Sequence, residues 1–403
     1  MTNPVLGSPP RGEDYFGQED LIDSIWEKLK TDNILLVAPR RFGKTAAMYR
    51  LCDEPRESFI PVYTNLEHIR KAGDFMVELI SKIYQKRKFK RIIHKLWSNS
   101  KKIADLMRSI PEDIDIGGFK VTIREKTDIP DNWYSYGERI MELLAREKPS
   151  LLLILDEFAV MIDEIAKSRF DEAKQLLRWF RAARIAPETK TRFVIGGSIH
   201  LIPTLDSIGL VDTINDLFNQ KIKPFSLETA TKYIEVIFQS RNISLPNDVK
   251  NEILDLVGVP IPYILAVFLT AIFDKQRAQK CKITKGLVKD VFQEDLLSGS
   301  TSATFHHYRS RINSYYLDWE KLTARTLLGK LSLTNDGFES KTLYQIFLNV
   351  NTLNHSIKTQ EDFQHLMNKL DNDFYISSQD GKYDFFSRVL KLWWRTYYGF
   401  QGE

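Results

Sequence analysis

Residues 34–45 read Ile34-Leu35-Leu36-Val37-Ala38-Pro39-Arg40-Arg41-Phe42-Gly43-Lys44-Thr45. The apolar run at the start predicts a buried strand, Pro39 and Gly43 predict a tight loop, and residues 46–51 are compatible with a following helix. In this order, backbone N–H groups and a helix N-terminus surround one point, which is how proteins hold phosphate groups. Ala38 replaces the first glycine of the strict pattern, and its small side chain still permits the turn. The stretch therefore predicts a phosphate-binding loop in an α/β fold.

A second segment, Leu151-Leu152-Leu153-Ile154-Leu155-Asp156-Glu157, predicts a buried strand that ends in two carboxylates. In a nucleoside triphosphate site, Lys44 would neutralise the outer phosphate charge, while Thr45 and Asp156 would hold Mg²⁺. Glu157 would polarise the attacking water. A buried strand followed by two solvated acids is the simpler alternative, but both segments together, in this order, favour a nucleotide site.

Composition limits the functional classes. The chain has 403 residues, of which 43% are hydrophobic, so we expect two or three domains with sizeable cores. Its net charge of +4 is far from the strong positive field of a dedicated nucleic-acid-binding protein. Cys52 and Cys281 offer neither a disulfide framework nor a metal cluster, which suits the reducing cytoplasm. We expect no signal peptide, and the longest apolar stretch, residues 261–273, is too short to span a membrane.

Strand and helix patterns alternate over the first part of the chain, which predicts a parallel sheet with helices on both faces. Besides the two segments above, we expect strands at residues 59–64, 119–124, 192–198 and 220–224. We expect helices at residues 20–30, 75–84, 92–107, 133–147 and 170–184.

Helical patterns dominate the rest of the chain, at residues 227–240, 248–257, 261–275, 283–293, 315–331, 341–349, 360–370 and 388–398. Two strand-like runs, residues 374–377 and 383–386, flank Asp380 and Gly381, a pair typical of a hairpin. Three helices followed by a hairpin indicate a winged-helix domain. With polar residues 298–302 as a linker, we predict a P-loop ATPase α/β core at 1–225, a helical lid at 226–297 and a winged-helix-like domain at 298–403.

The sequence resembles the AAA+ and STAND-type P-loop ATPases, most of all small prokaryotic ATPases related to the origin-recognition ATPases. The matching segments are Tyr15-Phe16-Gly17-Gln18-Glu19, Pro39-Arg40-Arg41-Phe42-Gly43-Lys44-Thr45, Leu155-Asp156-Glu157, Gly196-Gly197-Ser198, Asn215-Asp216-Leu217 and Val257-Gly258-Val259-Pro260-Ile261-Pro262-Tyr263. Gln18 departs from the family pattern, which has an arginine there. The resemblance implies an AAA+-like core that uses ATP and Mg²⁺.

The resemblance also implies roles for individual residues. Phe16 would pack on adenine; the simpler alternative is a hydrophobic anchor. Pro260 would close the lid near the base; the simpler alternative is that it starts a helix. Ser198 would contact the attacking water or the γ-phosphate, or is a turn serine. The predicted catalytic residues are Glu157, Lys44 and Ser198, and the metal-binding residues are Thr45 and Asp156. The predicted nucleotide-binding residues are Phe16, Ala38, Pro39, Arg40, Arg41, Phe42, Gly43, Lys44, Thr45, Ala46 and Pro260.

Two groups of basic residues are open to more than one interpretation. Arg178, Arg181 and Arg184 recur on one face of a predicted helix, from which one of them could reach the nucleotide of a neighbouring subunit. The basic run at residues 86–91 could bind nucleic-acid phosphate. For both groups a solvated helix face is the interpretation that we favour, and we assign no arginine finger.

Three functions fit these patterns. We favour an ATP-hydrolysing switch that controls self-association or a protein partner, with no membrane partner. The alternative is a DNA-associated AAA+ ATPase of the origin-recognition or transposition-helper type. Glu361 and Asp362 count against it, because they lie on the helix that would enter the DNA groove. A nucleotide-dependent scaffold with little turnover is the third, and the intact loop and acidic strand count against it.

Overall fold

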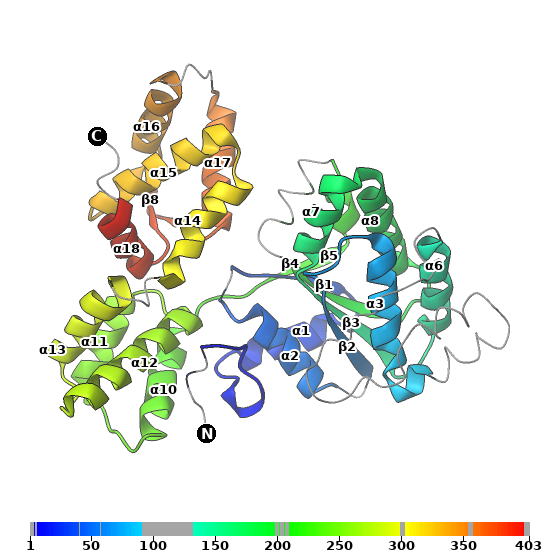
Figure 1. Cartoon of the computed structure of the whole chain (residues 1–403), viewed down its shortest axis with the longest axis horizontal. Helices are drawn as coiled ribbons and strands as arrows, with labels where there is room; N and C mark the ends of the chain where they lie inside the picture. Colours follow the sequence, from blue (N-terminus) through cyan, green and yellow to red (C-terminus); the bar gives the residue numbers. More distant parts are fainter. Residues whose placement is uncertain are drawn as a thin grey trace. The chain divides into compact units, whose positions relative to one another are not determined.

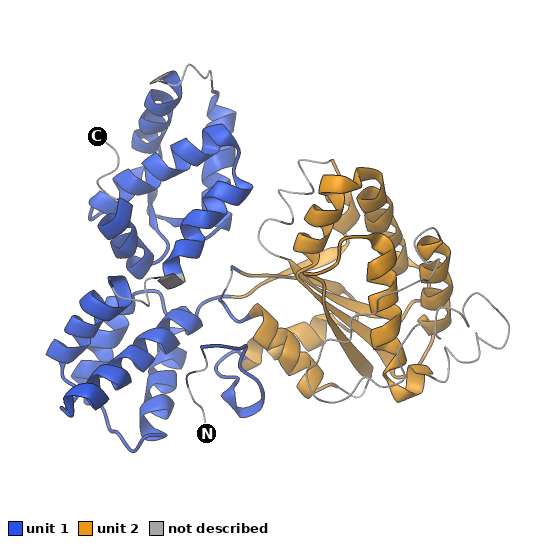
Figure 2. Ribbon diagram, in the orientation of Figure 1, with its two compact units in different colours: residues 1–18, 39–43, 223–403 blue, residues 19–38, 44–222 orange. Residues whose placement is uncertain are grey.

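The computed structural model describes residues 4, 6–39, 41–56, 58–90, 132–197, 201, 205, 209–298, 303–353 and 358–398. The chain forms two compact units, one of residues 19–38 and 44–222 and the other of residues 1–18, 39–43 and 223–403 (Figure 2). Residues 39–43, in the predicted phosphate-binding loop, therefore belong to the unit that contains the C-terminal half of the chain. The finer division into three domains, with boundaries at 225 and 297, stays a prediction.

The unit of residues 19–38 and 44–222 is a five-stranded parallel sheet with helices on both faces (Figure 1). Its strand order is β2-β3-β4-β1-β5. Its elements are α1 (Glu19–Lys28), β1 (Asn33–Val37), α2 (Lys44–Asp53), β2 (Phe59–Asn65), α3 (Ala72–Tyr84), α6 (Trp133–Leu144), β3 (Ser150–Asp156), α7 (Phe158–Ser168), α8 (Phe170–Ile185), β4 (Arg192–Gly197), η2 (Val211–Ile214) and β5 (Leu217–Lys221). Because all neighbouring strands are parallel, their carboxyl ends meet at one edge of the sheet.

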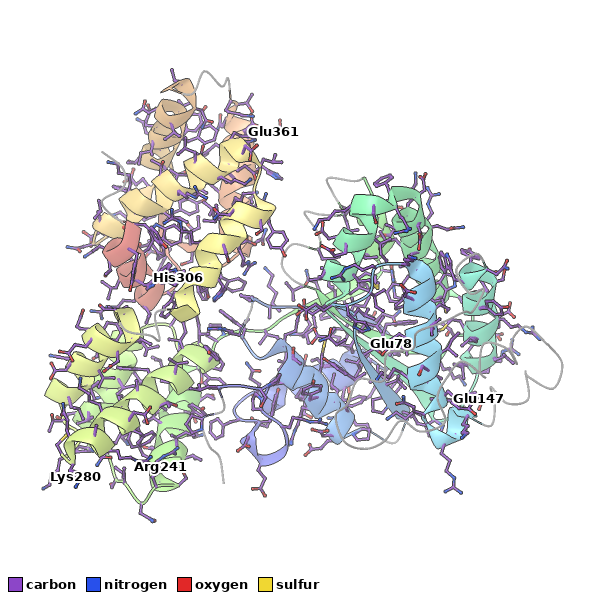
Figure 3. All side chains as sticks on the ribbon, viewed as in Figure 1. Glu78, Glu147, Arg241, Lys280, His306 and Glu361 are labelled. Carbon is purple, nitrogen blue, oxygen red and sulfur yellow. The ribbon has the colours of Figure 1, made fainter. Side chains whose placement is uncertain are left out.

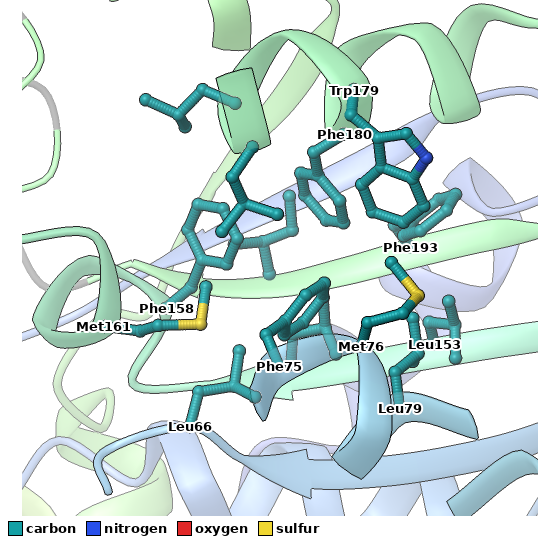
Figure 4. Packing of buried hydrophobic residues seen from close by; sticks show 14 of the residues in the cluster. Leu66, Phe75, Met76, Leu79, Leu153, Phe158, Met161, Trp179, Phe180 and Phe193 are labelled. Carbon is teal, nitrogen blue, oxygen red and sulfur yellow. The ribbon is translucent and has the colours of Figure 1, made fainter. Parts of the chain in front are cut away.

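The alternation of side chains along β3 divides the core into two layers. Leu151, Leu153 and Leu155 join the large apolar cluster under α3, α6, α7 and α8. Leu152 and Ile154 point to the opposite face, where α1 and α2 pack on the sheet. Stacked and edge-to-face aromatic rings fill the larger layer, as Figure 4 shows for Phe158, Phe180 and Phe193. Every residue of β3 is buried, so the end of this strand is held firmly in place.

Most of the predicted elements of this unit are present, with two differences. The strand predicted at 220–224 is β5, which begins at Leu217 because that residue pairs with Asn33 of β1. The helix α7 was not predicted, since it follows the acidic strand without an intervening turn signal. The helix predicted at 92–107 and the strand predicted at 119–124 lie outside the described residues.

The other unit is mostly helical. Its elements are η1 (Gly12–Asp14), α10 (Leu227–Gln239), α11 (Asn247–Val257), α12 (Pro262–Gln279), α13 (Lys285–Val291), η3 (Phe292–Leu297), α14 (Ala303–Tyr315), α15 (Asp318–Leu333), β6 (Phe338–Glu339), α16 (Ser340–Leu353), α17 (Gln360–Asn372), β7 (Ile376–Gln379), β8 (Lys382–Phe385) and α18 (Arg388–Tyr398). The apolar stretch at 261–273 lies in α12 and supplies much of the buried surface of this unit. No helix among the described residues is long and apolar enough to cross a membrane.

The predicted hairpin is confirmed as β7 and β8, which pair antiparallel with each other. β6 pairs antiparallel with the other edge of β8. Asp380 and Gly381 have φ angles of 51° and 79°, the left-handed values that a tight two-residue hairpin loop requires. β7 starts at Ile376 rather than at the predicted Phe374, because Phe374 has a φ of 58° and is not extended. The helix α14 was not predicted, and the assignment of these elements to the winged-helix class stays a prediction.

Two helical glycines provide a matched test of core packing. A Cβ atom on Gly137 of α6 would lie 2.7 Å from the rigid Trp179 ring, whereas a Cβ on Gly286 of α13 would meet only Thr284 Oγ1 at 3.7 Å. We expect Gly137→Ala to destabilise the protein by about 1–3 kcal/mol, as overpacked cores do. Gly286→Ala should be neutral or stabilising by up to about 1 kcal/mol. Urea unfolding of both variants measures the difference, and equal stabilities would contradict the packing described for Trp179.

Candidate functional site

The residues predicted from two distant segments form one polar cluster at the carboxyl edge of the sheet. The Lys44 ammonium lies 3.4 Å from Asp156 Oδ1 and 3.5 Å from Glu157 Oε1. The Thr45 hydroxyl donates a hydrogen bond of 2.7 Å to Asp156 Oδ2. α2 begins at Lys44, and β3 ends at Asp156. The parallel sheet therefore brings the start of the loop helix and the acidic strand together, although β4 lies between β1 and β3.

Asp156 is 1% exposed, and both of its carboxylate oxygens have partners. The Glu157 N–H donates to Oδ1 at 2.9 Å, and the Tyr63 hydroxyl donates to Oδ2 at 3.3 Å. Burial, and then the negative charge of Asp156, raise the pKa of Tyr63 far above its ordinary value, so its phenol stays protonated and donates. Tyr63 belongs to no motif recognisable in the sequence. It lies in the predicted strand at 59–64, but no local pattern indicates that this strand is the neighbour of β3.

Glu157 occupies the turn between β3 and α7. Its φ of 56° and ψ of 30° are left-handed, a conformation that is uncommon for a residue with a side chain and costs about 1 kcal/mol or more. Its side chain is 30% exposed, in contrast to the 2% of Asp156. The two neighbouring acids therefore differ in environment, since one is buried and hydrogen-bonded while the other reaches solvent beside Lys44.

Gly196 of β4 allows a close approach to Asp156. A Cβ atom at this position would lie 2.7 Å from both Asp156 Oδ1 and Met48 Cε, and 3.2 Å from Asp156 Cα. Because the Asp156 backbone cannot move out of β3 without breaking the sheet, only glycine fits here. The glycine at position 196 is thus explained by packing against Asp156. Ser198, which was predicted to follow it in the site, lies outside the described residues, as does Arg40 of the loop.

The oxygen ligands in the cluster fit Mg²⁺. This ion prefers carboxylate and hydroxyl oxygens, and in phosphoryl-transfer sites it is held by one or two protein groups together with substrate phosphates. Thr45 and Asp156 supply one hydroxyl and one carboxylate within hydrogen-bonding distance of each other. No group of three or more His, Cys, Asp and Glu side chains that could hold a metal by itself occurs in the described part of the chain. The donor set thus matches a metal bound jointly by protein and nucleotide.

Ala38, directly after β1, and Ala46, in α2, are buried in the sheet unit. The other described residues of the loop, 39 and 41–43, belong to the unit that contains the C-terminal half of the chain. Phe42 is 0% exposed, and its ring centroid lies 5.3 Å from that of Phe374 and 6.4 Å from that of Phe386. The Arg41 guanidinium lies 4.3 Å from the centre of the Tyr263 ring at the start of α12. Pro39 is buried. Positive φ angles of 74° at Arg41 and 93° at Gly43 shape this part of the loop.

Phe16 and Pro260, the two residues predicted to contact the base, belong to the same unit as each other. The Phe16 ring centroid lies 5.4 Å from that of Tyr233 and 6.4 Å from that of Phe225. The Phe225 N–H donates to the Pro260 carbonyl oxygen at 3.1 Å, so Phe225 contacts both Phe16 and Pro260. Phe16 is thus part of an aromatic cluster, and its contact with adenine stays a prediction.

The arginines of α8 do not share one environment. The Arg184 side chain is 0% exposed, and its guanidinium donates to Asp216 Oδ1 and Oδ2 at 2.7 and 2.8 Å and to the Thr213 carbonyl oxygen at 2.5 Å. Arg181 donates to Asn215 Oδ1 at 3.4 Å, and Arg178 is exposed. A solvated basic face is therefore wrong for Arg184. The segment Asn215-Asp216-Leu217, noted for its family resemblance, provides partners for α8.

Gly196→Ala tests the packing around Asp156. We expect a loss of stability of about 1–3 kcal/mol from overpacking, together with at least about a tenfold loss of Mg²⁺-dependent ATP affinity as the carboxylate is displaced. Gly197→Ala is the matched control, because its Cβ would approach Leu35 Cδ1 at 2.8 Å and Leu201 Cδ2 at 3.6 Å rather than Asp156. It should reduce stability without changing Mg²⁺-dependent binding. Calorimetric titration of both variants with ATP and Mg²⁺ provides the measurement, and equal binding defects would contradict the expectation.

No protein-family model and no curated protein sequence matches the chain. Solved structures do. The chain is similar to the Walker-type ATPase of Pyrococcus abyssi, with a TM-score of 0.61, 17% identity and coverage of 97% of this chain and 99% of that one. It is also similar to the ORC2 protein of Aeropyrum pernix in its ADPNP–ADP complexes, with a TM-score of 0.53, 12% identity and coverage of 94% and 93%. The chain has the AAA+ P-loop ATPase fold that its sequence predicted.

Proposed function

We propose that this protein binds ATP with Mg²⁺, hydrolyses it, and uses the bound nucleotide as a switch that controls self-association or a protein partner. The observation that carries the ATPase assignment is the cluster of Lys44, Thr45, Asp156 and Glu157, built from a loop helix and an acidic strand. The similarity to a Walker-type ATPase supports it at the level of the fold.

Each residue of the cluster has a distinct chemical role in this proposal. Lys44 neutralises negative charge on the outer phosphates, and backbone N–H groups at the start of α2 bind them. Thr45 and Asp156 would hold Mg²⁺, which would supply positive charge beside the phosphate oxygens. Glu157, the more exposed acid, orients a water and accepts its proton as the water oxygen bonds to the γ-phosphorus. The bond from phosphorus to the bridging oxygen breaks, which yields ADP and inorganic phosphate.

The proposed switch rests on the division of the loop between units. Lys44 and Thr45 belong to the sheet unit, whereas Phe42 is buried against Phe374 and Phe386 and Arg41 contacts a ring at the start of α12. Because only Gly43 separates Phe42 from Lys44, phosphates that reposition Lys44 also change the constraint on the packing of Phe42. The loop thereby couples nucleotide binding to the aromatic residues that flank the C-terminal hairpin.

The DNA-associated alternative finds less support, because basic side chains of the C-terminal elements already have partners. Lys369 of α17 is buried and bonds to Glu320 at 2.7 Å. On α18, Lys391 contacts Asp384, Arg388 donates to the Asp255 carbonyl oxygen, and Arg395 donates to the Ser332 and Thr334 carbonyl oxygens. These interactions compete with phosphate for the same donors.

Exposed acids on α17 also oppose a DNA-reading role for that helix. Glu361 projects from the start of α17 (Figure 3) and is exposed. Asp362 caps the helix by accepting from the Thr359 N–H at 2.8 Å, and this hydrogen bond lowers the pKa of Asp362, so it is ionised at neutral pH. In the basic run at 86–91, Lys88 lies 3.7 Å from Glu147 and donates to the Pro149 carbonyl oxygen at 3.1 Å. Negative charge on α17 and the pairing of Lys88 in the basic run both weaken an attraction to phosphate.

The ATPase assignment is tested by turnover and nucleotide binding with and without DNA, at low and moderate salt. We expect Lys44→Ala to lose ATP binding, because the loop loses its cation, and Glu157→Gln to retain binding but lose turnover. Slow turnover that is indifferent to DNA supports the switch. Tight ATP binding by Lys44→Ala would refute the site, and unchanged turnover in Glu157→Gln would remove Glu157 as the base. Stimulation by DNA that fades with salt would establish the alternative instead.

The switch is tested with Phe42→Leu, which keeps an apolar side chain but removes the ring from the Phe374–Phe386 contact. We expect ATP to alter amide hydrogen exchange at residues 374–386 in the wild type, and this response to be lost in the variant. Phe347→Leu is the matched control, since Phe347 is also 0% exposed but packs on Phe363 and Trp319, away from the loop. A wild-type response in Phe42→Leu would contradict the coupling.

A further inference from the structure

We infer that Tyr63 is a positioning residue of the ATPase site, whose hydroxyl fixes the carboxylate of Asp156 in the orientation that faces Thr45. The inference rests on the proposed function and adds to it a residue that neither the loop nor the acidic strand contains. It starts from one contact, in which the Tyr63 hydroxyl donates to Asp156 Oδ2 at 3.3 Å. The same oxygen accepts from the Thr45 hydroxyl at 2.7 Å.

The sheet register explains how Tyr63 reaches this carboxylate. β2 lies at the edge of the sheet beside β3, with Asn65 opposite Asp156 and Tyr63 opposite Ile154. Tyr63 therefore lies two residues before the position opposite Asp156, on the same face of the sheet as Asn65. Its long side chain extends toward the carboxyl edge and places the hydroxyl at Asp156, a distance that a shorter polar residue at this position would not cover.

Tyr63 is itself held by the helix that carries the loop lysine. The ring of Tyr49, on α2, lies 4.8 Å from the Tyr63 ring between centroids, with an interplanar angle of 57°. α2 begins with Lys44 and Thr45 and packs on β2 and β3. The Tyr63 side chain thus contacts both elements that build the proposed metal site: it packs on and hydrogen-bonds to Tyr49 of the loop helix, and its hydroxyl donates to the acidic strand.

The partners of Asp156 divide between its two oxygens. Oδ1 accepts from the Glu157 N–H and lies 3.4 Å from the Lys44 ammonium, while Oδ2 accepts from the Thr45 and Tyr63 hydroxyls. Without the Tyr63 hydroxyl, Oδ2 keeps one donor, and that donor is the other predicted metal ligand. Partners that orient a ligating carboxylate are worth about 10–100-fold in metal affinity or activity when they are removed. Tyr63 is the partner of Oδ2 that is not itself proposed to bind the metal.

Tyr63→Phe removes the hydroxyl, with its hydrogen bonds to Asp156 and Tyr49, and keeps the ring and its packing on the Tyr49 ring. We expect the Mg²⁺ concentration for half-maximal ATP binding to rise about tenfold, while ATP affinity without Mg²⁺ and the melting temperature stay close to those of the wild type. Saturating Mg²⁺ should restore most of kcat. The comparison variant is Tyr49→Phe, which removes a hydrogen bond to Tyr63 but leaves the Tyr63 hydroxyl on Asp156, and its Mg²⁺ dependence should shift much less than that of Tyr63→Phe. Calorimetric titration of full-length protein with ATP at stepped Mg²⁺ concentrations measures these values.

Three outcomes would overturn the inference. An unchanged Mg²⁺ dependence in Tyr63→Phe would show that the hydroxyl does not position Asp156. A weaker ATP affinity at all Mg²⁺ concentrations, with a lower melting temperature, would assign Tyr63 a purely structural role. An equal shift in Tyr49→Phe would attribute the effect to the ring pair rather than to Asp156. Failure of the proposed function is distinguishable from all three, because the wild type itself would then show no Mg²⁺-dependent ATP binding.

Discussion

The burial of the Asp156 carboxylate is the constraint on which the rest of the site depends. A carboxylate that is 1% exposed loses its water, and for its charged form this loss costs several kcal/mol unless charged and hydrogen-bonding partners replace it. Here the partners come from every side: a lysine and a threonine at the start of α2, the backbone N–H of the next residue, and a tyrosine from the edge strand. The loop helix, the edge strand and the acidic strand must therefore all be in place before this charge is stable.

This requirement accounts for features that otherwise have no common cause. β3 is buried along its whole length, so the carboxylate at its end has little freedom to move toward solvent. Gly196 leaves the space that Asp156 Oδ1 occupies, and the left-handed Glu157 turns the chain so that its N–H points back to that oxygen. The strain at Glu157, of about 1 kcal/mol or more, is offset by a hydrogen bond to a charged acceptor, worth about 1.5–3 kcal/mol. Local strain thus persists because it satisfies a buried charge.

The sequence predicts the parts of this arrangement that are encoded locally. The run 34–45 combines a strand, a loop and a helix start within a few residues, and Asp156 and Glu157 follow an apolar strand directly, so both are recognisable without a structure. Tyr63 and Phe42 acquire their roles from strand order and from packing on residues far along the chain, which no local periodicity encodes. The Gly-Gly pair at the end of β4 was predicted as part of a sensor strand, but the packing of Gly196 against Asp156 depends on the β3–β4 register. Arg184 was misinterpreted because helical spacing shows which residues share a face and not whether that face is buried.

The two ends of the phosphate-binding loop differ in how strongly their conformations are held. At Lys44 and Thr45 it is fixed to the sheet by charged and hydrogen-bonded contacts, whereas at Arg41 a left-handed φ of 74° costs about 1–2 kcal/mol. The contact of the Arg41 guanidinium with the Tyr263 ring contributes about 0.5–2 kcal/mol, so the two terms nearly cancel. A ligand shifts such a balance only by the difference between its affinities for the two loop conformations. In the proposed switch, phosphates would meet that condition by taking the Lys44 ammonium from Asp156 and Glu157, because only Gly43 separates Lys44 from buried Phe42 in the chain.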